Sequence, residues 1–173
     1  MEKIEKTAGR SRASLKGRKY LAFSLSSEVY GIDILKVKEI IGVPEITHVP
    51  RLPAFIRGVV NLRGKIIPVL DLRLKLDFEP REYDERTCII ILEVDTAEGL
   101  IQLGVIIDRV LDVMNLTQEQ IEPSPSFGVK INTAFILGMA KVNNKVISIL
   151  DIQQLLTTED MSQLQSVAQE QPQ

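Results

Sequence analysis

The chain has 173 residues, of which 45% are apolar and 25% are charged, the composition of a soluble globular protein with room for a core. One cysteine, Cys88, excludes an internal disulfide framework and a cysteine-based zinc site, and one histidine, His48, leaves little for a histidine metal cluster. The formal net charge of −2 argues against a nucleic-acid-binding surface over the whole protein. We therefore expect no metal ion and no cofactor.

The two ends of the chain differ from its middle. Residues 1–19 carry seven Lys or Arg and two Asp or Glu, and we expect residues 1–18 to be a disordered basic tail. Residues 157–173 predict a short helix, N-capped by Thr158, that ends in a frayed acidic tail. The N-terminal run has no apolar stretch of signal-peptide length, and the longest apolar run, Cys88–Leu92, is far below the roughly 20 residues that span a bilayer. A cytoplasmic protein without direct membrane insertion is expected.

The first predicted element is a pair of strands within residues 20–34, joined by a polar turn around Ser26. A segment rich in turn residues and prolines follows, over residues 34–53. It contains an apolar–charged–apolar stripe around Val37 and Glu39. That stripe fits either a half-buried edge strand or a docking surface.

A β-hairpin is the next predicted element. A strand over residues 58–62 meets the two-residue turn Arg63-Gly64, and a second strand follows over residues 65–70. Asp71 then stands where a helix N-cap should, ahead of a short helical turn. A type I′ turn forces Arg63 into a left-handed conformation that is costly for a non-glycine residue. Either a functional reason or a longer turn with a solvated arginine accounts for that choice.

The same pattern returns 80 residues later, after a polar linker and a second pair of strands. Eight of 22 positions are identical when residues 55–76 are placed over residues 135–156 without a gap, among them Phe55 with Phe135. Gly31 and Gly104 stand at matching places in the two strand pairs. One supersecondary unit has therefore been built twice. About five short strands in each unit predict an all-β protein of two small barrels, over residues 19–84 and 85–156.

Signatures of enzymes are missing. Gly58 and Gly64-Lys65 lack the spacing of a phosphate-binding P-loop and its following Ser or Thr, and there is no G-x-S-x-G elbow. The acidic residues Glu82, Asp84 and Glu85 cluster in a polar linker that most simply joins the two units. We therefore expect no catalytic residue and no catalytic activity.

Three strings in the chain resemble a known family. They are YGIDILKVKEIIG from Tyr30, PAFIRGVVNLRGKIIPVLDLR from Pro53 and LTQEQIEPSPSF from Leu116. Over about residues 20–160 the chain resembles the CheW family of bacterial chemotaxis coupling proteins, because NLRG followed by an apolar-Pro-apolar strand and DLR is highly specific to CheW-like domains. The kinase CheA and CheV also carry such a domain, but this chain has no kinase domain and no room for a receiver domain.

The resemblance implies two five-stranded SH3-like β-barrels packed together, with short helices and no cofactor. It also implies an adaptor that couples the histidine kinase CheA to the cytoplasmic tips of transmembrane chemoreceptors, at arrays on the inner face of the membrane. The family's receptor-contacting positions match Val37, Glu39, Gly58, Arg63 and Gly64. Its kinase-contacting positions match Ile46 in the first unit and Phe127 in the second; near Phe127, Glu122 stands where the family often has a basic residue.

Other binding classes stay open at this point. A nucleic-acid-binding barrel needs a basic face with stacking aromatics, and the segment between the tails is acidic with few aromatics. A groove for proline-rich peptides needs Trp and Tyr, and the chain has no Trp. The alternative function is therefore an SH3-like module that binds another protein or peptide outside chemotaxis.

Overall fold

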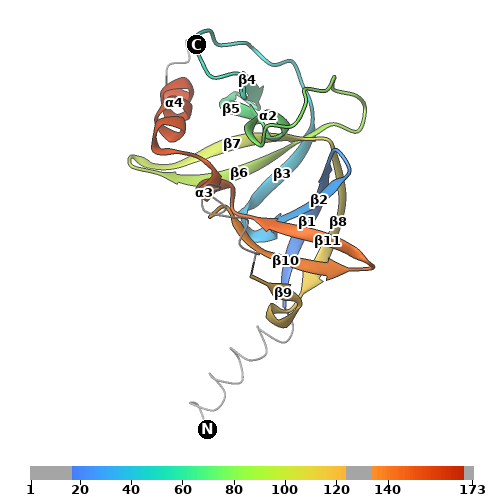
Figure 1. Cartoon of the computed structure of the whole chain (residues 1–173). Coiled ribbons are helices and arrows are strands. Elements are labelled where there is room, and N and C mark those ends of the chain that lie inside the picture. Colours follow the sequence, from blue (N-terminus) through green and yellow to red (C-terminus); the bar gives the residue numbers. More distant parts are fainter. Residues whose placement is uncertain (1–16, 124–133, 170–173) are drawn as a thin grey trace.

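The computed structural model describes residues 17–123 and 134–169, which form two curved β-sheets with short helices at their margins (Figure 1). Strands predominate, which confirms the expected all-β class. Within the described residues, no helix is long and apolar enough to cross a membrane. The predicted basic tail lies outside these residues, apart from Gly17 and Arg18, where the first strand begins.

Sheet A has six strands in the order β8-β1-β2-β11-β10-β9, and sheet B has five in the order β3-β6-β7-β5-β4. Sheet A consists of β1 (Arg18–Leu25), β2 (Glu28–Asp33), β8 (Arg109–Leu116), β9 (Ile121–Glu122), β10 (Ile136–Val142) and β11 (Lys145–Leu150). Sheet B consists of β3 (Val37–Gly42), β4 (Ile56–Leu62), β5 (Lys65–Asp71), β6 (Cys88–Thr96) and β7 (Gly99–Ile107). The helical elements are η1 (Ile34–Lys36), α2 (Leu72–Lys75), η2 (Gln118–Gln120), α3 (Ile152–Leu155) and α4 (Thr158–Gln169).

Both predicted hairpins are present. β4 and β5 meet at Arg63-Gly64, whose φ angles are 53° and 83°, and β10 and β11 meet at Asn143-Asn144, with φ angles of 51° and 64°. Positive φ at both central residues is the conformation of a type I′ turn. The cap after the first hairpin is also confirmed, because Asp71 Oδ1 accepts a hydrogen bond from the backbone N–H of Arg73 at 3.0 Å.

Each sheet combines strands from both copies of the repeat. The β1–β2 hairpin pairs with β8 and β11 in sheet A, and the β6–β7 hairpin pairs with β3 and β5 in sheet B. The predicted boundary between residues 84 and 85 separates the two copies but does not separate the two sheets. The chain changes sheet inside each copy, between β2 and β3 and again between β7 and β8. The first hairpin of each copy thus pairs with the second hairpin of the other copy, an arrangement we call the strand exchange. Because of this pairing, the inner edges of β5 and β11 are hydrogen-bonded rather than open.

The register shows that this exchange is symmetric. Val69 of β5 lies opposite Gly104 of β7, and Ile149, 80 positions after Val69, lies opposite Gly31 of β2. Gly31 and Gly104 are therefore equivalent, as the sequence predicts. A Cβ atom on Gly104 would lie 2.9 Å from Ile89 Cγ2 and one on Gly31 would lie 3.1 Å from Ile149 Cδ1, so each glycine makes room for an opposing side chain.

Phe55 and Phe135 also occupy equivalent environments. Each is half-buried against the same central cluster. The carbonyl of Phe55 accepts a hydrogen bond from the N–H of Asp71 at 2.7 Å, and the carbonyl of Phe135 accepts one from Asp151 at 2.8 Å. The duplication predicted from the 80-residue offset is thus present in three dimensions.

The two sheets differ in one strand. β9 adds two residues to the edge of β10, so sheet A has six strands rather than the five predicted. In sheet B the corresponding contact is a single bridge between Thr47 and Val59. Thr47 follows β3, and β3 and β4 are the outer strands of sheet B. The two margins of sheet B therefore approach each other, as the barrel prediction requires.

The core consists of a central cluster between the sheets and a smaller cluster inside each sheet. β6 shows how one strand serves two of them, because Ile90 and Leu92 face the central cluster while Ile89 and Ile91 face the cluster inside sheet B. Successive side chains of a strand point to opposite faces, and both faces of β6 are covered. The uninterrupted apolar run in β6 is therefore a consequence of burial on both faces.

The C-terminal helix α4 packs on β4, β5 and β6. Leu164 and Val167 are buried and Met161 packs on the central cluster, as their helical spacing predicts. The predicted cap is one residue too late. Thr157 Oγ1 accepts from the N–H of Asp160, and Asp160 Oδ2 accepts from the N–H of Thr157, both at 3.0 Å, which makes Thr157 the N-cap of a reciprocal capping box.

Candidate functional site

Two of the predicted receptor-contacting residues form an ion pair. Arg63 Nη1 donates to Glu39 Oε2 at 3.3 Å, and Arg63 Nη2 also contacts Glu39 Oε1. The side chains are 71% and 32% exposed, respectively. The pair joins the turn between β4 and β5 to β3 at the opposite margin of sheet B. It therefore lies on the surface where the sheet curls back on itself.

The turn presents Arg63 in a fixed direction. Gly64 donates its N–H to Asn61 Oδ1 at 2.9 Å. This hydrogen bond links the end of β4 to the second residue of the turn and so holds Arg63 between them. Gly64 has a φ of 83° with open space where a Cβ atom would lie, so its requirement is conformational rather than steric. The left-handed Arg63 carries the strain that the sequence predicts for this position.

The ion pair changes the charge behaviour expected of each partner. The hydrogen bond from Arg63 holds the pKa of the Glu39 carboxyl below its ordinary value of 4.5. The same contact raises the pKa of Arg63. In the structure the two charges neutralise each other, so a charged partner must compete with this internal pair.

Val37 and Gly64 lie close to the pair in the fold, whereas Gly58 does not. Val37 is the first residue of β3, is half-buried and precedes Glu39 by two positions, with a β-bulge between them. Gly58 lies four residues before Leu62 along β4 and is buried. With a φ of 140°, a Cβ atom on Gly58 would lie 2.0 Å from the carbonyl oxygen of Thr47. Its position indicates a packing role beneath the Thr47–Val59 bridge.

Ile46, the predicted kinase-contacting residue of the first unit, comes just before Thr47, which bridges to Val59 of β4. It is half-buried and packs on the cluster inside this sheet. It lines a surface depression together with His48, Arg57 and Tyr83. The second predicted kinase contact, Phe127, lies outside the described residues.

A buried ion cluster was missed by the sequence analysis. Asp108 Oδ2 accepts from Arg73 Nη1 at 2.6 Å, from Arg81 Nη1 at 3.3 Å and from the backbone N–H of Ser26 at 2.7 Å. The side chains of Arg73 and Asp108 are only 10% and 7% exposed. This Asp108 cluster ties the β1–β2 turn of sheet A to α2 beside sheet B. The signal for this cluster in the sequence was Arg73, the arginine of the DLR string. It follows a buried apolar strand, and a buried arginine needs an acidic partner.

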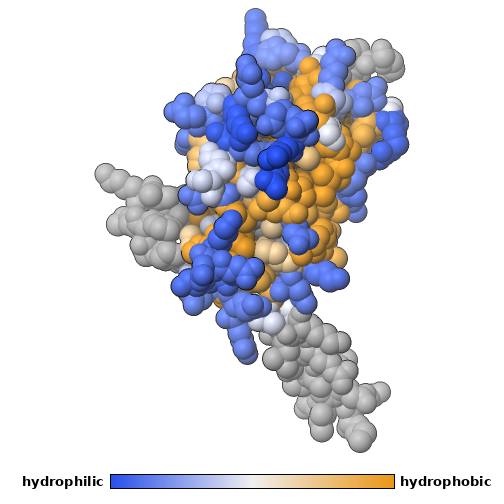
Figure 2. All heavy atoms as spheres, turned by 90° about the vertical axis from the view of Figure 1, so that its right-hand side faces the viewer, coloured by the Kyte–Doolittle hydropathy of each residue, from blue (hydrophilic) through white to orange (hydrophobic). Residues whose placement is uncertain are grey.

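Several apolar side chains on the surface have no role in the core. Leu111 and Val113 on the outer strand β8 are 40% and 46% exposed, and Ile40 on β3 is 40% exposed. Viewed from the right-hand side of Figure 1, the molecule shows an apolar area bordered by polar groups (Figure 2). Apolar surface framed by polar side chains is typical of protein-interaction sites. Among the described residues, no group of three or more His, Cys, Asp or Glu side chains is arranged to hold a metal ion.

Comparison with known proteins places these features in a family. The model of the CheW-like domain matches residues 19–160. The chain is 41% identical over 152 residues to the chemotaxis protein CheW of Klebsiella aerogenes, covering 88% of this chain and 89% of that protein. It is 31% identical over 146 residues to the chemotaxis protein CheW of Thermotoga maritima, covering 83% of this chain and 90% of the relative.

A solved structure shows the same fold. The crystal structure of the CheW scaffolding protein of Thermoanaerobacter tengcongensis superposes with a TM-score of 0.73 at 37% sequence identity. The match covers 84% of this chain and 97% of that chain. The whole two-sheet body is therefore shared with that scaffolding protein.

Proposed function

The chain belongs to the CheW family, and on that premise we propose that it is a non-catalytic chemotaxis adaptor that couples the histidine kinase CheA to the cytoplasmic tips of transmembrane chemoreceptors. The observation that carries the proposal is the match of the CheW-like domain to almost the whole described body, including the NLRG turn that holds Arg63. The protein acts at receptor arrays on the inner face of the membrane. It binds no cofactor and catalyses no reaction.

The receptor contact includes the Arg63–Glu39 pair. Val37, Glu39, Arg63 and Gly64 belong to one partly exposed region of sheet B, and Gly58 supports it by allowing the carbonyl of Thr47 to pack closely on β4. An exposed ion pair at a rim sets specificity and association rate more than affinity. A receptor helix that offers both an acidic and a basic side chain can replace each half of the pair with an intermolecular contact, while apolar side chains supply the buried area.

The kinase contacts are a separate pair of residues, one in each copy of the repeat. Ile46 lines a surface depression together with His48, Arg57 and Tyr83 and gives an apolar anchor there. Phe127 is the corresponding anchor of the second copy and stays a prediction from the sequence. Two sites on opposite copies let one adaptor join two kinase domains. An SH3-like module outside chemotaxis is the less favoured alternative, since no observation on the chain points to such a partner.

Co-sedimentation tests the proposal. The full chain is mixed with a regulatory fragment of CheA, with a receptor cytoplasmic fragment, and with both together. We expect binding to each fragment alone and joint sedimentation of all three. A chain that pellets with neither fragment contradicts the adaptor function. If the chain binds the kinase fragment but not the receptor fragment, the kinase contact is supported and the receptor contact is refuted.

A further inference from the structure

The surface depression beside Ile46 has a volume of about 330 Å³. The segment between β3 and β4 supplies Val43, Pro44 and Ile46 to its lining. The polar linker between the two copies supplies Tyr83, and Tyr83 packs on the same cluster inside sheet B as Ile46. The linker therefore shapes the depression that holds the proposed kinase contact, a task that a simple join between two units does not require.

A buried carboxylate holds the hydroxyl of Tyr83. The hydroxyl donates to Asp71 Oδ2 at 2.8 Å, and Asp71 is only 3% exposed. Asp71 is itself fixed, since its Oδ1 accepts from the N–H of Arg73 at 3.0 Å and its own N–H donates to the carbonyl of Phe55 at 2.7 Å. A buried carboxylate oxygen is costly to leave without a donor, so this hydrogen bond keeps the phenol in one place.

The linker is anchored on both sides of Tyr83. Two residues before it, Arg81 Nη1 donates to Asp108 Oδ2 at 3.3 Å. Directly after it, Asp84 Oδ1 accepts from the N–H of Arg86 at 2.8 Å, and this hydrogen bond holds the pKa of the Asp84 carboxyl below its ordinary value of 3.8. The backbone that carries Tyr83 is therefore fixed, and the direction of its ring depends on the contact with Asp71.

Open space lies on a second side of the tyrosine. Tyr83 and Arg57 also line a neighbouring depression of about 380 Å³, together with Asp71 and Arg81. Because Tyr83 and Arg57 line both depressions, they lie where the two adjoin. A ring that lost its hydroxyl contact would have room to turn, and the depression beside Ile46 would change shape.

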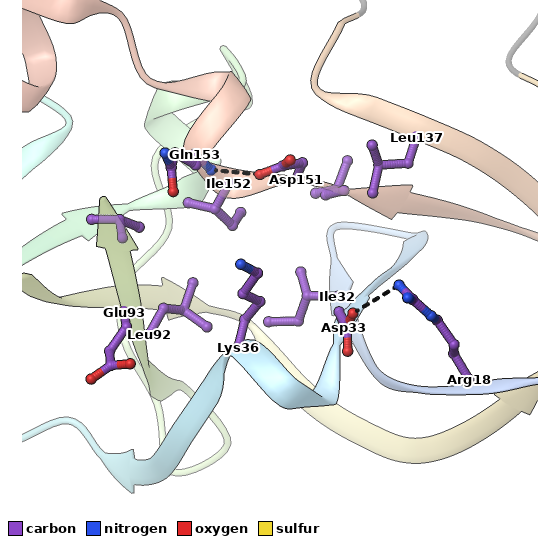
Figure 3. A pocket seen from close by; sticks show the side chains of 12 residues that line it. Arg18, Ile32, Asp33, Lys36, Leu92, Glu93, Leu137, Asp151, Ile152 and Gln153 are labelled. Carbon is purple, nitrogen blue, oxygen red and sulfur yellow. Dashed lines mark hydrogen bonds and ion pairs between the residues drawn. The ribbon is translucent and has the colours of Figure 1, made fainter. Parts of the chain in front are cut away.

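The second copy of the repeat shows that the helix cap alone needs no tyrosine. An offset of 80 residues places Asp151 at Asp71. Asp151 Oδ1 accepts from the N–H of Gln153 at 3.0 Å (Figure 3) and from the N–H of Gln154 at 3.4 Å. These backbone donors suffice to begin α3, and α4 follows where the first copy has the linker. The tyrosine on Asp71 is therefore an addition to the first copy, which is the copy that carries Ile46.

We propose that Tyr83 is a positioning residue of the kinase contact: Asp71 holds its ring so that the depression beside Ile46 stays open for an apolar side chain of the kinase regulatory domain. This positioning role rests on the proposed adaptor function and deepens its kinase contact. Without the hydroxyl the ring has several positions, and only one of them leaves the depression open. The apparent affinity then falls by the fraction of molecules in that position.

Tyr83→Phe removes the hydroxyl and keeps the ring. Its affinity for a CheA regulatory fragment should fall about fivefold, because the loss of one hydrogen bond changes the population ratio by that order. Its affinity for a receptor fragment should stay that of the wild type. Tyr30→Phe is the matched control, since Tyr30 is a half-buried tyrosine of β2 that stacks on Phe23, and it should bind the kinase fragment like the wild type.

A double-mutant cycle separates positioning from packing. Asp71→Asn keeps an oxygen for the helix cap but replaces the acceptor of the tyrosine by an amide NH₂, which cannot accept the hydroxyl proton. It should weaken kinase binding as much as Tyr83→Phe does, and the two changes together should weaken it no further, because both remove the same hydrogen bond. Additive losses would contradict the positioning role.

The hydrogen bond is also measured without the kinase. In the free, tyrosine-labelled chain the Cζ resonance of Tyr83 should shift in Asp71→Asn, and an unchanged resonance would overturn the proposal. Equal affinity of Tyr83→Phe and wild type for the kinase fragment would overturn it as well, while the adaptor function would stand. A wild-type chain that does not bind the kinase fragment would overturn both.

Discussion

At the scale of single residues, Arg63 combines a strained turn conformation with an ion pair to Glu39. Arg63→Asn replaces it with the residue of the second copy, so stability should stay unchanged or rise slightly while receptor affinity falls about tenfold, more at low salt than at high salt. Titrating a receptor fragment at two ionic strengths measures this. Equal affinity of variant and wild type would mean that Arg63 is only a turn residue.

The same variant has a consequence for the titration of Glu39. The pKa of Glu39 is depressed by the hydrogen bond from Arg63, so the pair contributes at pH values above about 4.5 and is lost as the pH falls through the folded-state pKa. In Arg63→Asn the pKa of Glu39 should therefore rise toward its ordinary value. A carboxyl NMR titration measures the shift, and Lys65→Asn on the next residue but one is a control for loss of charge alone. An unchanged pKa in Arg63→Asn would show that the pair does not form in solution.

Gly58 tests packing at the residue scale. Gly58→Ala should lower the free energy of unfolding by about 2 kcal/mol or more, because its φ is positive and its Cβ atom would meet the carbonyl oxygen of Thr47. Gly42→Ala is the matched control, since nothing lies within 4 Å of its Cβ position and its φ is not in the left-handed region. Chemical denaturation of both variants compares them. If Gly58→Ala leaves the free energy of unfolding unchanged, Gly58 has no packing role and is again a candidate for direct contact with the receptor.

At the scale of elements, α4 depends on Asp160, which joins its first turn to Lys75 of α2 at 2.7 Å. Burial opposes ionisation of Asp160, but hydrogen bonds from Lys75 and Thr157 outweigh it and the pKa of Asp160 lies below its ordinary value of 3.8. The stabilisation is thus complete above that pH and lost as the pH falls through the folded-state pKa. We expect amide exchange in α4 to accelerate first on acidification. Asp160→Asn should show this fast exchange at neutral pH, and unaltered exchange there would contradict the docking role of the ion pair.

At the scale of the whole molecule, the Asp108 cluster fixes one sheet against the other. Asp108→Ala leaves the buried Arg73 without its closest partner and should cost about 3 to 5 kcal/mol. Asp112→Ala, an exposed carboxylate on β8, should be nearly neutral. Thermal unfolding compares the two variants. If they behave alike, the cluster does not hold the sheets together.

The sequence predicted what is local and missed what is distant. The turn at Arg63, the cap at Asp71 and the helix stripe through Leu164 depend on residues a few positions apart, and all three are confirmed. The strand exchange between the copies could not be predicted from the sequence, because both connectivities bury the same apolar faces. The Arg63–Glu39 pair, 24 positions apart, and the Asp108 cluster depend on that topology, so no short window of sequence contains them. Phe127 lies outside the described residues, so its contact stays a prediction.

The shared sheets also shape how the protein is made. β2 pairs with β11, and Tyr30 lies opposite Ser148, more than a hundred positions later in the chain. At about 5 to 20 residues per second, the ribosome releases the first hairpin many seconds before its partner strand exists. During that interval the edge of β2 that later pairs with β11 has no partner strand, and an unpaired strand edge promotes aggregation. Sheet A is complete only when the last hairpin, β10–β11, has emerged and β11 pairs with β2.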